Sequence, residues 1–118
     1  MHKFINFNIN HLAGDEVKEI EIGDYNILFT FVSENFINIF GKWAVLNPDG
    51  SELTSGNAEK PDPAVNFDNF LHSKFEKYSL PNSEELHIKF SNGLTLVIYD
   101  NDPEFECCAI SPDIYVWV

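Results

Sequence analysis

The sequence predicts a single α+β domain over residues 1–118: a largely antiparallel sheet of six to eight strands, with one helix at about residues 64–79 packed on one face. Three observations lead to this prediction. Short apolar segments are separated by turn signals along most of the chain, which is typical of strands. Two apolar runs between Leu86 and Asp100 flank Asn92-Gly93, a strong β-hairpin signal. Apolar residues also follow Asp62-Pro63 at helical spacing.

Composition excludes several classes of function. A chain of 118 residues with 44% hydrophobic residues and eleven Phe is one globular domain and not a disordered chain. Nineteen Asp and Glu oppose seven Lys and no Arg, which gives a net charge of −12. Nucleic acid and anionic membranes are therefore disfavoured as partners, because both require cationic patches. A cationic partner is favoured, since its approach would be electrostatically steered, and solubility alone is the competing explanation.

The expected location is cytoplasmic. Residues 1–10 lack a charged segment followed by an apolar stretch, so no secretory signal is predicted. No apolar run approaches the ~20 residues that a membrane span requires. Cys107 and Cys108 are adjacent, and neighbours on a strand point to opposite faces. We expect buried free thiols there and not a vicinal disulfide.

The first half of the chain contains four segments with strand patterns: residues 3–10, 17–22, 25–32 and 36–46. The first carries a row of Asn that is expected to face water or a partner. In the second, Ile20 and Ile22 are expected to point inward. A hairpin loop at 33–35 joins the last two strands. Gly41 predicts a bulge or a close approach of backbone.

A turn and a helix are predicted in the middle of the chain. Residues 47–50, NPDG, form a strong turn. Residues 51–61 are polar and are expected to be mobile apart from a short returning strand at 52–54. The helix at about 64–79 has Asp62 as its N-cap and ends before Pro81. Its apolar stripe, which would cover the hairpin that follows, consists of Phe67, Phe70, Leu71, Phe75 and Tyr78.

The hairpin of residues 86–100 is expected to turn on Asn92 and Gly93 alone, because both accept the positive φ of a type I′ turn. Such a two-residue turn pairs Ile88 with Val97 and Leu86 with Tyr99. Residues 94–99 are apolar on both faces, which is typical of an interior strand covered on two sides. Two closing strands, 105–110 and 114–118, are separated by Ser111-Pro112-Asp113.

No catalytic signature is found, so no catalytic residue, cofactor or metal is predicted. The best metal candidate is Asp68, His72 and Glu76, spaced to share one face of the predicted helix. A small metal-dependent hydrolase that uses His72 and Asp68 therefore stays open as an alternative, although a solvated polar face is the commoner explanation. Cys107 and Cys108 lie beside Glu106 in an apolar strand, where the pKa of a thiol would rise.

Acidic residues concentrate in two groups. The first comprises Asp15, Glu16, Glu19, Glu21 and Asp24. The second is predicted to be the partner-binding site, and it comprises Glu84, Glu85, Asp100, Asp102, Glu104 and Glu106. The hairpin would gather this second group at its open end. Six carboxylates on one rim repel one another, and a cationic partner would relieve that repulsion.

The order of these segments resembles that of the small, acidic immunity proteins of bacterial contact-dependent and polymorphic toxin systems. The segments YNILFTFV, FINIFGKWAVL and NPDG are followed by the hairpin and by IYVWV. Small bacterial families of unknown function look similar. Trp43, Gly93 and Trp117 are the individual residues that align, whereas Ala44 stands where such families often carry Arg.

The resemblance implies a non-catalytic role, namely tight binding to one cognate cationic toxin domain, often a nuclease, whose active site or substrate surface is occluded. A structural or oligomerisation module is a further alternative. It would use the Asn-lined first strand as a sheet edge.

Overall fold

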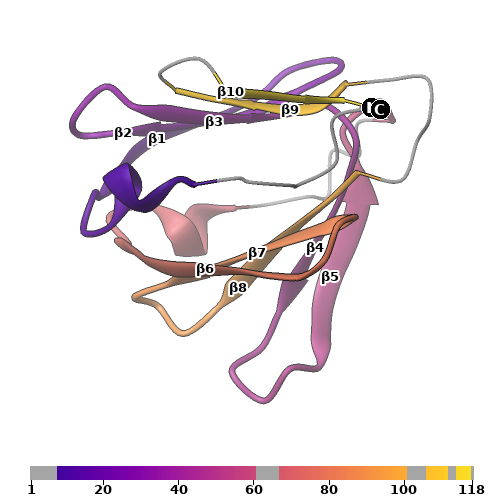
Figure 1. The fold of residues 1–118 in the computed structure, drawn as a ribbon. Helices are drawn as coiled ribbons and strands as arrows, with labels where there is room; N and C mark the ends of the chain where they lie inside the picture. The colour runs from indigo at the N-terminus through magenta and orange to yellow at the C-terminus, as the bar shows by residue number, and fades with distance from the viewer. Residues whose placement is uncertain (1–7, 61–66, 101–105, 112–113, 118) are drawn as a thin grey trace.

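The computed structural model describes residues 8–60, 67–100, 106–111 and 114–117, and for Glu106 and 114–117 the backbone alone. The described chain forms two five-stranded antiparallel sheets that lie face to face (Figure 1). The first sheet has the strand order β1 (Val17–Ile22), β2 (Ile27–Phe31), β3 (Phe36–Ile39), β9 (Glu106–Ile110) and β10 (Ile114–Trp117). The second has the order β5 (Glu52–Asn57), β4 (Lys42–Leu46), β8 (Thr95–Tyr99), β7 (Glu85–Phe90) and β6 (Phe75–Asn82).

The two sheets are joined along one side. The Phe75 amide donates to the Asp15 carbonyl at 2.9 Å, and the Phe75 carbonyl accepts from the Gly14 amide at 2.7 Å. Glu16 and Lys74 form an isolated antiparallel bridge next to it. Two short 3-10 turns, η1 (Asn10–Leu12) and η2 (Asp68–Phe70), lie along this side between the layers (Figure 1). No helix among the described residues is long and apolar enough to cross a membrane.

Aromatic rings fill the space between the sheets. Phe29 from the first sheet and Phe90 from the second have ring centroids 6.4 Å apart. Phe70 of η2 packs edge-on between them, at 5.7 Å from Phe29 and 5.1 Å from Phe90. Phe67 packs in the same way against Phe29 and against Trp43. Edge-to-face pairs at these separations are favourable beyond the area that they bury. The segment around η2 therefore supplies a central part of the core.

The α+β prediction is wrong, because strands make up nearly all of the regular secondary structure in the described chain, which contains no α-helix. Residues 64–66 of the predicted helix lie outside the described part, η2 occupies 68–70, residues 71–74 form a turn, and strand β6 begins at Phe75. A bulge in β6 between Phe75 and Lys77 explains the error. It places Phe75 and Tyr78, three residues apart, on the same side of the strand, so the spacing imitates a helical repeat. Pro81 is tolerated because β6 is an edge strand.

The segment predicted as one strand over 36–46 is two strands in different sheets. The chain leaves the first sheet after Ile39 and enters the second at Lys42. At the crossing, the Phe40 amide donates to the Cys107 carbonyl, and the Gly41 carbonyl accepts from the Ala58 amide, both at 2.9 Å. A Cβ on Gly41 would meet no atom within 4 Å, so the predicted close approach of backbone is wrong.

The β7–β8 hairpin is confirmed, but its predicted register is wrong by one residue. The loop has three residues, Ser91 to Gly93, with Phe90 and Leu94 joined by a hydrogen bond of 3.0 Å and Gly93 at φ 88°. Leu86 pairs with Ile98 and Ile88 with Leu96. A one-residue shift exchanges the two faces of a strand. Leu96 and Ile98 therefore face the core, whereas Val97 lies on the outer face and is buried there beside its partner Ala44.

Other predictions are confirmed. β1 has the predicted bounds, and Ile27, Phe29 and Phe31 of β2 line the core. The 47–50 turn joins β4 and β5, with the Gly50 amide donating to the Asn47 carbonyl at 2.9 Å. The returning strand β5 is longer than predicted. In the first predicted strand, residues 3–7 lie outside the described part and Asn10 begins η1.

Candidate partner-binding surfaces

The structure brings together part of the predicted acidic site. The Asp100 amide donates to the Glu84 carbonyl at 2.8 Å, so these two residues meet at the open end of the β7–β8 hairpin, as expected. Asp100, however, is fully buried, whereas Glu84 is exposed. Asp102 and Glu104 lie outside the described residues, and Glu106 is described by its backbone at the start of β9. The predicted rim of six exposed carboxylates is therefore wrong for Asp100, and it stays a prediction for Asp102, Glu104 and Glu106.

Glu85 is engaged within its own sheet. Its carboxylate accepts a hydrogen bond of 2.9 Å from the Asn82 amide and lies 2.9 Å from His87 Nε2. The hydrogen bonds from Asn82 and His87 hold the pKa of Glu85 below its usual value. Two contacts that stabilise the ionised form leave this carboxylate less available to a partner.

In the first acidic group, two residues form contacts within the protein and three are exposed. The Asp15 carboxylate accepts from the Ser33 hydroxyl and, at 3.3 Å, from the Ser33 amide. Glu16 lies 3.5 Å from His72 Nδ1. Glu19, Glu21 and Asp24 are exposed and follow the β1–β2 hairpin. Sequence reasoning had treated all five residues alike, because it had no information about their local partners.

Two carboxylates on β1 repel each other. Glu19 and Glu21 are two residues apart, past the bulge that ends at Glu19, and share the outer face of the strand. The pKa of Glu21 is raised, first by a side-chain hydrogen bond with Glu19 and then by the negative charge of that residue. A raised carboxylate pKa means that its ionisation is opposed by its surroundings.

Two exposed apolar side chains lie at the turn end of the same hairpin. Ile22 is 45% exposed, and Tyr25 in the turn is 72% exposed. Ile22 is on the inward side of the strand, as predicted, because its cross-strand partner Ile27 is buried, and it is the last residue of β1. We define Glu19, Glu21, Asp24 and Tyr25 as the acidic hairpin patch. After Val17, no described strand pairs with the outer edge of β1.

The proposed metal and nucleophile candidates are separated by the fold. Asp68 is in η2, His72 follows it with φ 67°, and Glu76 is in the bulge of β6, so the three do not share a helix face. No group of three His, Cys, Asp or Glu suited to a metal occurs among the described residues. Cys107 and Cys108 are buried, with their Sγ atoms 3.5 Å apart, and the hydrogen bond between them and burial raise the pKa of Cys107.

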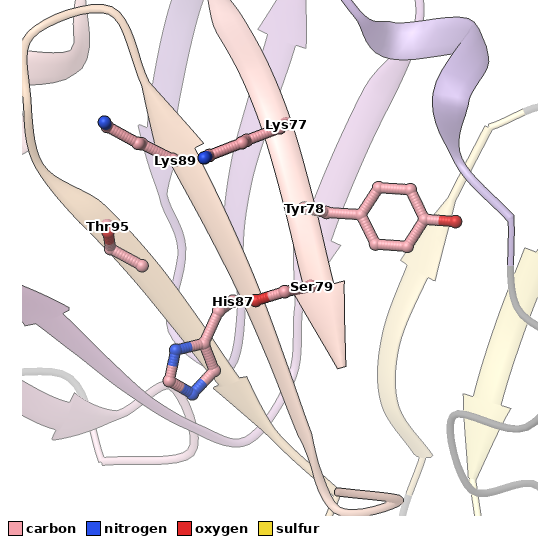
Figure 2. Close-up of a pocket in the computed structure, with 6 residues that line it drawn as sticks. All are labelled: Lys77, Tyr78, Ser79, His87, Lys89 and Thr95. Atoms are coloured by element: carbon pink, nitrogen blue, oxygen red, sulfur yellow. The ribbon is translucent and has the colours of Figure 1, made fainter. Parts of the chain in front are cut away.

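A pocket of about 430 Å³ opens on the outer face of the second sheet. It is lined by Lys77, Tyr78, Ser79, His87, Lys89 and Thr95 (Figure 2). Sequence reasoning missed this site because it assigned Lys77 to a helix and put His87 and Lys89 in another register. The missed signal is the alternation in Lys77/Ser79 and His87/Lys89, which places each pair on one face of a strand.

Comparison of the chain with protein-family models, with curated proteins and with solved structures finds no match. Function therefore has to be inferred from the side chains themselves.

Proposed function

We propose that this protein is a non-catalytic inhibitor that binds a cationic protein through the acidic hairpin patch. The observation that carries the proposal is the pair of mutually repelling carboxylates, Glu19 and Glu21, in the same hairpin as the exposed ring of Tyr25. A cationic side chain placed between the two carboxylates would remove their repulsion and gain two charge-assisted hydrogen bonds.

The composition of the patch resembles that of a protein interface. Tyr is enriched among the residues that dominate binding energy. The carboxylates, together with the net charge of −12, would accelerate the approach of a cationic partner. The exposed edge of β1 can also accept an added strand.

The class of partner is proposed from the resemblance in segment order. An immunity protein would occupy the phosphate-binding Lys and Arg of a cognate toxin domain, such as a nuclease, and block its substrate by occlusion. Glu84 with its acidic neighbours in the sequence is the second candidate contact, at the open end of the β7–β8 hairpin.

The test is calorimetric titration of the purified protein with a toxin domain cloned from a gene adjacent to its own. Tyr25→Ala should weaken binding by about tenfold or more, as expected for a central aromatic contact. The double variant that combines Glu19→Gln and Glu21→Gln should associate with the toxin domain more slowly, and its affinity should depend less on salt. Glu76→Gln, an exposed carboxylate on β6, is the matched control and should bind like the unchanged protein.

Two results would contradict the proposal. One is equal affinity of the unchanged protein for the toxin domain at low and high salt. The other is an affinity for Tyr25→Ala that equals that of the control, provided that both variants unfold at the temperature of the parent protein.

A further inference from the structure

We propose that the pocket on the outer face of the second sheet binds a phosphoryl group of a small molecule. This site is independent of the acidic hairpin patch, which belongs to the other sheet. Figure 2 shows the side chains of Lys77, Ser79, His87 and Lys89 on one side of β6 and β7, with Tyr78 directed to the opposite side. Thr95 on β8 completes the row, because it pairs with Lys89.

Two like charges face each other in this pocket. Lys77 and Lys89 are direct cross-strand partners on β6 and β7. Like charges in directly opposite positions destabilise a sheet. Both lysines are exposed, and neither forms an ion pair with a carboxylate of the described residues, although the chain carries nineteen Asp and Glu. An anion between the two ammonium groups would replace this repulsion by two attractions.

The remaining donors lie in the next row of the same face. Ser79 pairs with His87 across β6 and β7, so a hydroxyl and an imidazole line the pocket one row from the two lysines. Glu85 lies 2.9 Å from His87 Nε2 and can fix the orientation of that ring. Two carboxylates are near in sequence: Glu76, which precedes Lys77 in the bulge of β6, and Glu85, whose contacts with Asn82 and His87 hold it at the end of the row.

The chemistry favours a phosphoryl group over a carboxylate. Lysines act as point charges and suit a tetrahedral dianion, whereas planar carboxylates are better matched by the fork of Arg, which this chain lacks. Ser and Thr hydroxyls can donate to the remaining oxygens. The volume of about 430 Å³ exceeds that of one phosphate and lies within the range of small-molecule pockets. The pocket can therefore hold a phosphate together with an organic group.

The experiment is NMR titration of the full chain with inorganic phosphate, with acetate at the same ionic strength as the competing anion. We expect saturable shifts at His87, Lys89 and Thr95 with phosphate and weaker ones with acetate. Lys77→Gln and Lys89→Gln should each lower phosphate affinity by about fivefold, the effect of one screened charge contact. Lys60→Gln, an exposed lysine outside the pocket, is the matched control and should leave affinity unchanged.

Lys89→Glu separates binding from folding. It converts the repelling pair into an attracting one, so the variant should unfold at the same or a higher temperature while its phosphate shifts disappear. Three outcomes would overturn the proposal: shifts that do not saturate, equal affinity for acetate and phosphate, or equal loss of affinity in Lys60→Gln and Lys77→Gln.

Discussion

At the scale of single residues, Trp43 shows how a strand can be built around one large side chain. It is 2% exposed, and its ring packs edge-on against Phe67 with centroids 4.8 Å apart. Its cross-strand partner on β5 is Gly56. A Cβ on Gly56 would lie 2.7 Å from Trp43 Cζ2, so the absence of a side chain on β5 makes room for the indole.

Gly56→Ala should therefore destabilise the protein by about 1–3 kcal/mol, because the core around the indole must shift. Gly41→Ala is the control, since a Cβ there meets nothing within 4 Å and its φ is not in the left-handed region. That variant should lose no stability and gain up to about 1 kcal/mol from a stiffer unfolded chain. Urea denaturation of both variants measures the difference, and equal midpoints would contradict the packing explanation.

The two adjacent cysteines lead to a second residue-scale prediction. The hydrogen bond with Cys108 and then burial raise the pKa of Cys107, so its thiol is protonated at neutral pH and is a poor nucleophile. An aromatic disulfide reagent at pH 7 should modify neither Cys107 nor Cys108 in the native protein, and both after addition of urea. Rapid native modification of either thiol would show that this part of β9 opens easily or that the pKa is not raised.

At the scale of elements, the tip of the β7–β8 hairpin is tied to the segment that leads into β6. The side-chain Nδ2 of Asn92 donates to the backbone carbonyl of Asn69 at 2.8 Å, and its side-chain Oδ1 accepts from the backbone amide of Leu94 at 2.9 Å. The buried Ser73 hydroxyl accepts from the backbone amide of Asn92 at 3.1 Å and lies 3.1 Å from Ser91 Oγ. These contacts hold η2, and with it Phe70, under the second sheet.

Asn92→Ala removes both side-chain hydrogen bonds and should cost about 1–2 kcal/mol of unfolding free energy. Asn69→Ala is a matched control, because Asn92 bonds to the backbone carbonyl of Asn69, which the substitution leaves in place. Thermal unfolding of the two variants should therefore separate them. If Asn69→Ala were as damaging as Asn92→Ala, the side chain of Asn69 would have a role that the hydrogen bonds do not account for.

The same elements show what the sequence could and could not predict. Strand alternation located β1 and β2 correctly, because each side of those strands faces one environment. Phe75 and Tyr78 led to the wrong helix prediction, because a bulge gives them helical spacing. The strand that fixes their direction, β7, follows later in the sequence. Asn92-Gly93 predicted the hairpin correctly but not its register, because Ser91 joins the loop in response to contacts with Ser73 and Lys74.

The candidate sites depended on the same long-range pairings. The acidic hairpin patch was partly predictable, since Glu19 and Glu21 alternate with inward-facing residues along a strand. The exposure of Tyr25 was not predictable, because it depends on where β2 begins. The phosphoryl pocket required knowledge that β6 is a strand and that Lys77 pairs with Lys89. A single sequence carries no local signal for that pairing.

At the scale of the whole molecule, the net charge of −12 opposes folding through the repulsion of exposed carboxylates. Their pKa values move in both directions. Asp49 and Glu85 have lowered pKa values, owing to hydrogen bonds from Ser51 and from Asn82, so each stabilises the folded state above its unfolded pKa and loses this contribution as pH falls. Glu21 has a raised pKa and acts in the opposite direction. Its ionisation favours unfolding as pH rises above 4.5.

Glu19→Gln tests whether the repulsion between Glu19 and Glu21 destabilises the folded protein, which a bound cationic partner would relieve. The amide would donate to the Glu21 carboxylate, so the variant should unfold at a higher temperature than the parent protein at pH 7. The difference should vanish well below pH 4.5, where Glu21 is protonated in both proteins, and should shrink in 1 M salt through screening. Glu76→Gln removes the same formal charge from β6, away from the Glu19–Glu21 pair, so its thermal unfolding across the same pH series should follow the parent. An equal gain in Glu76→Gln would mean that net charge alone, and not the Glu19–Glu21 contact, sets the free-energy cost that binding at this hairpin relieves.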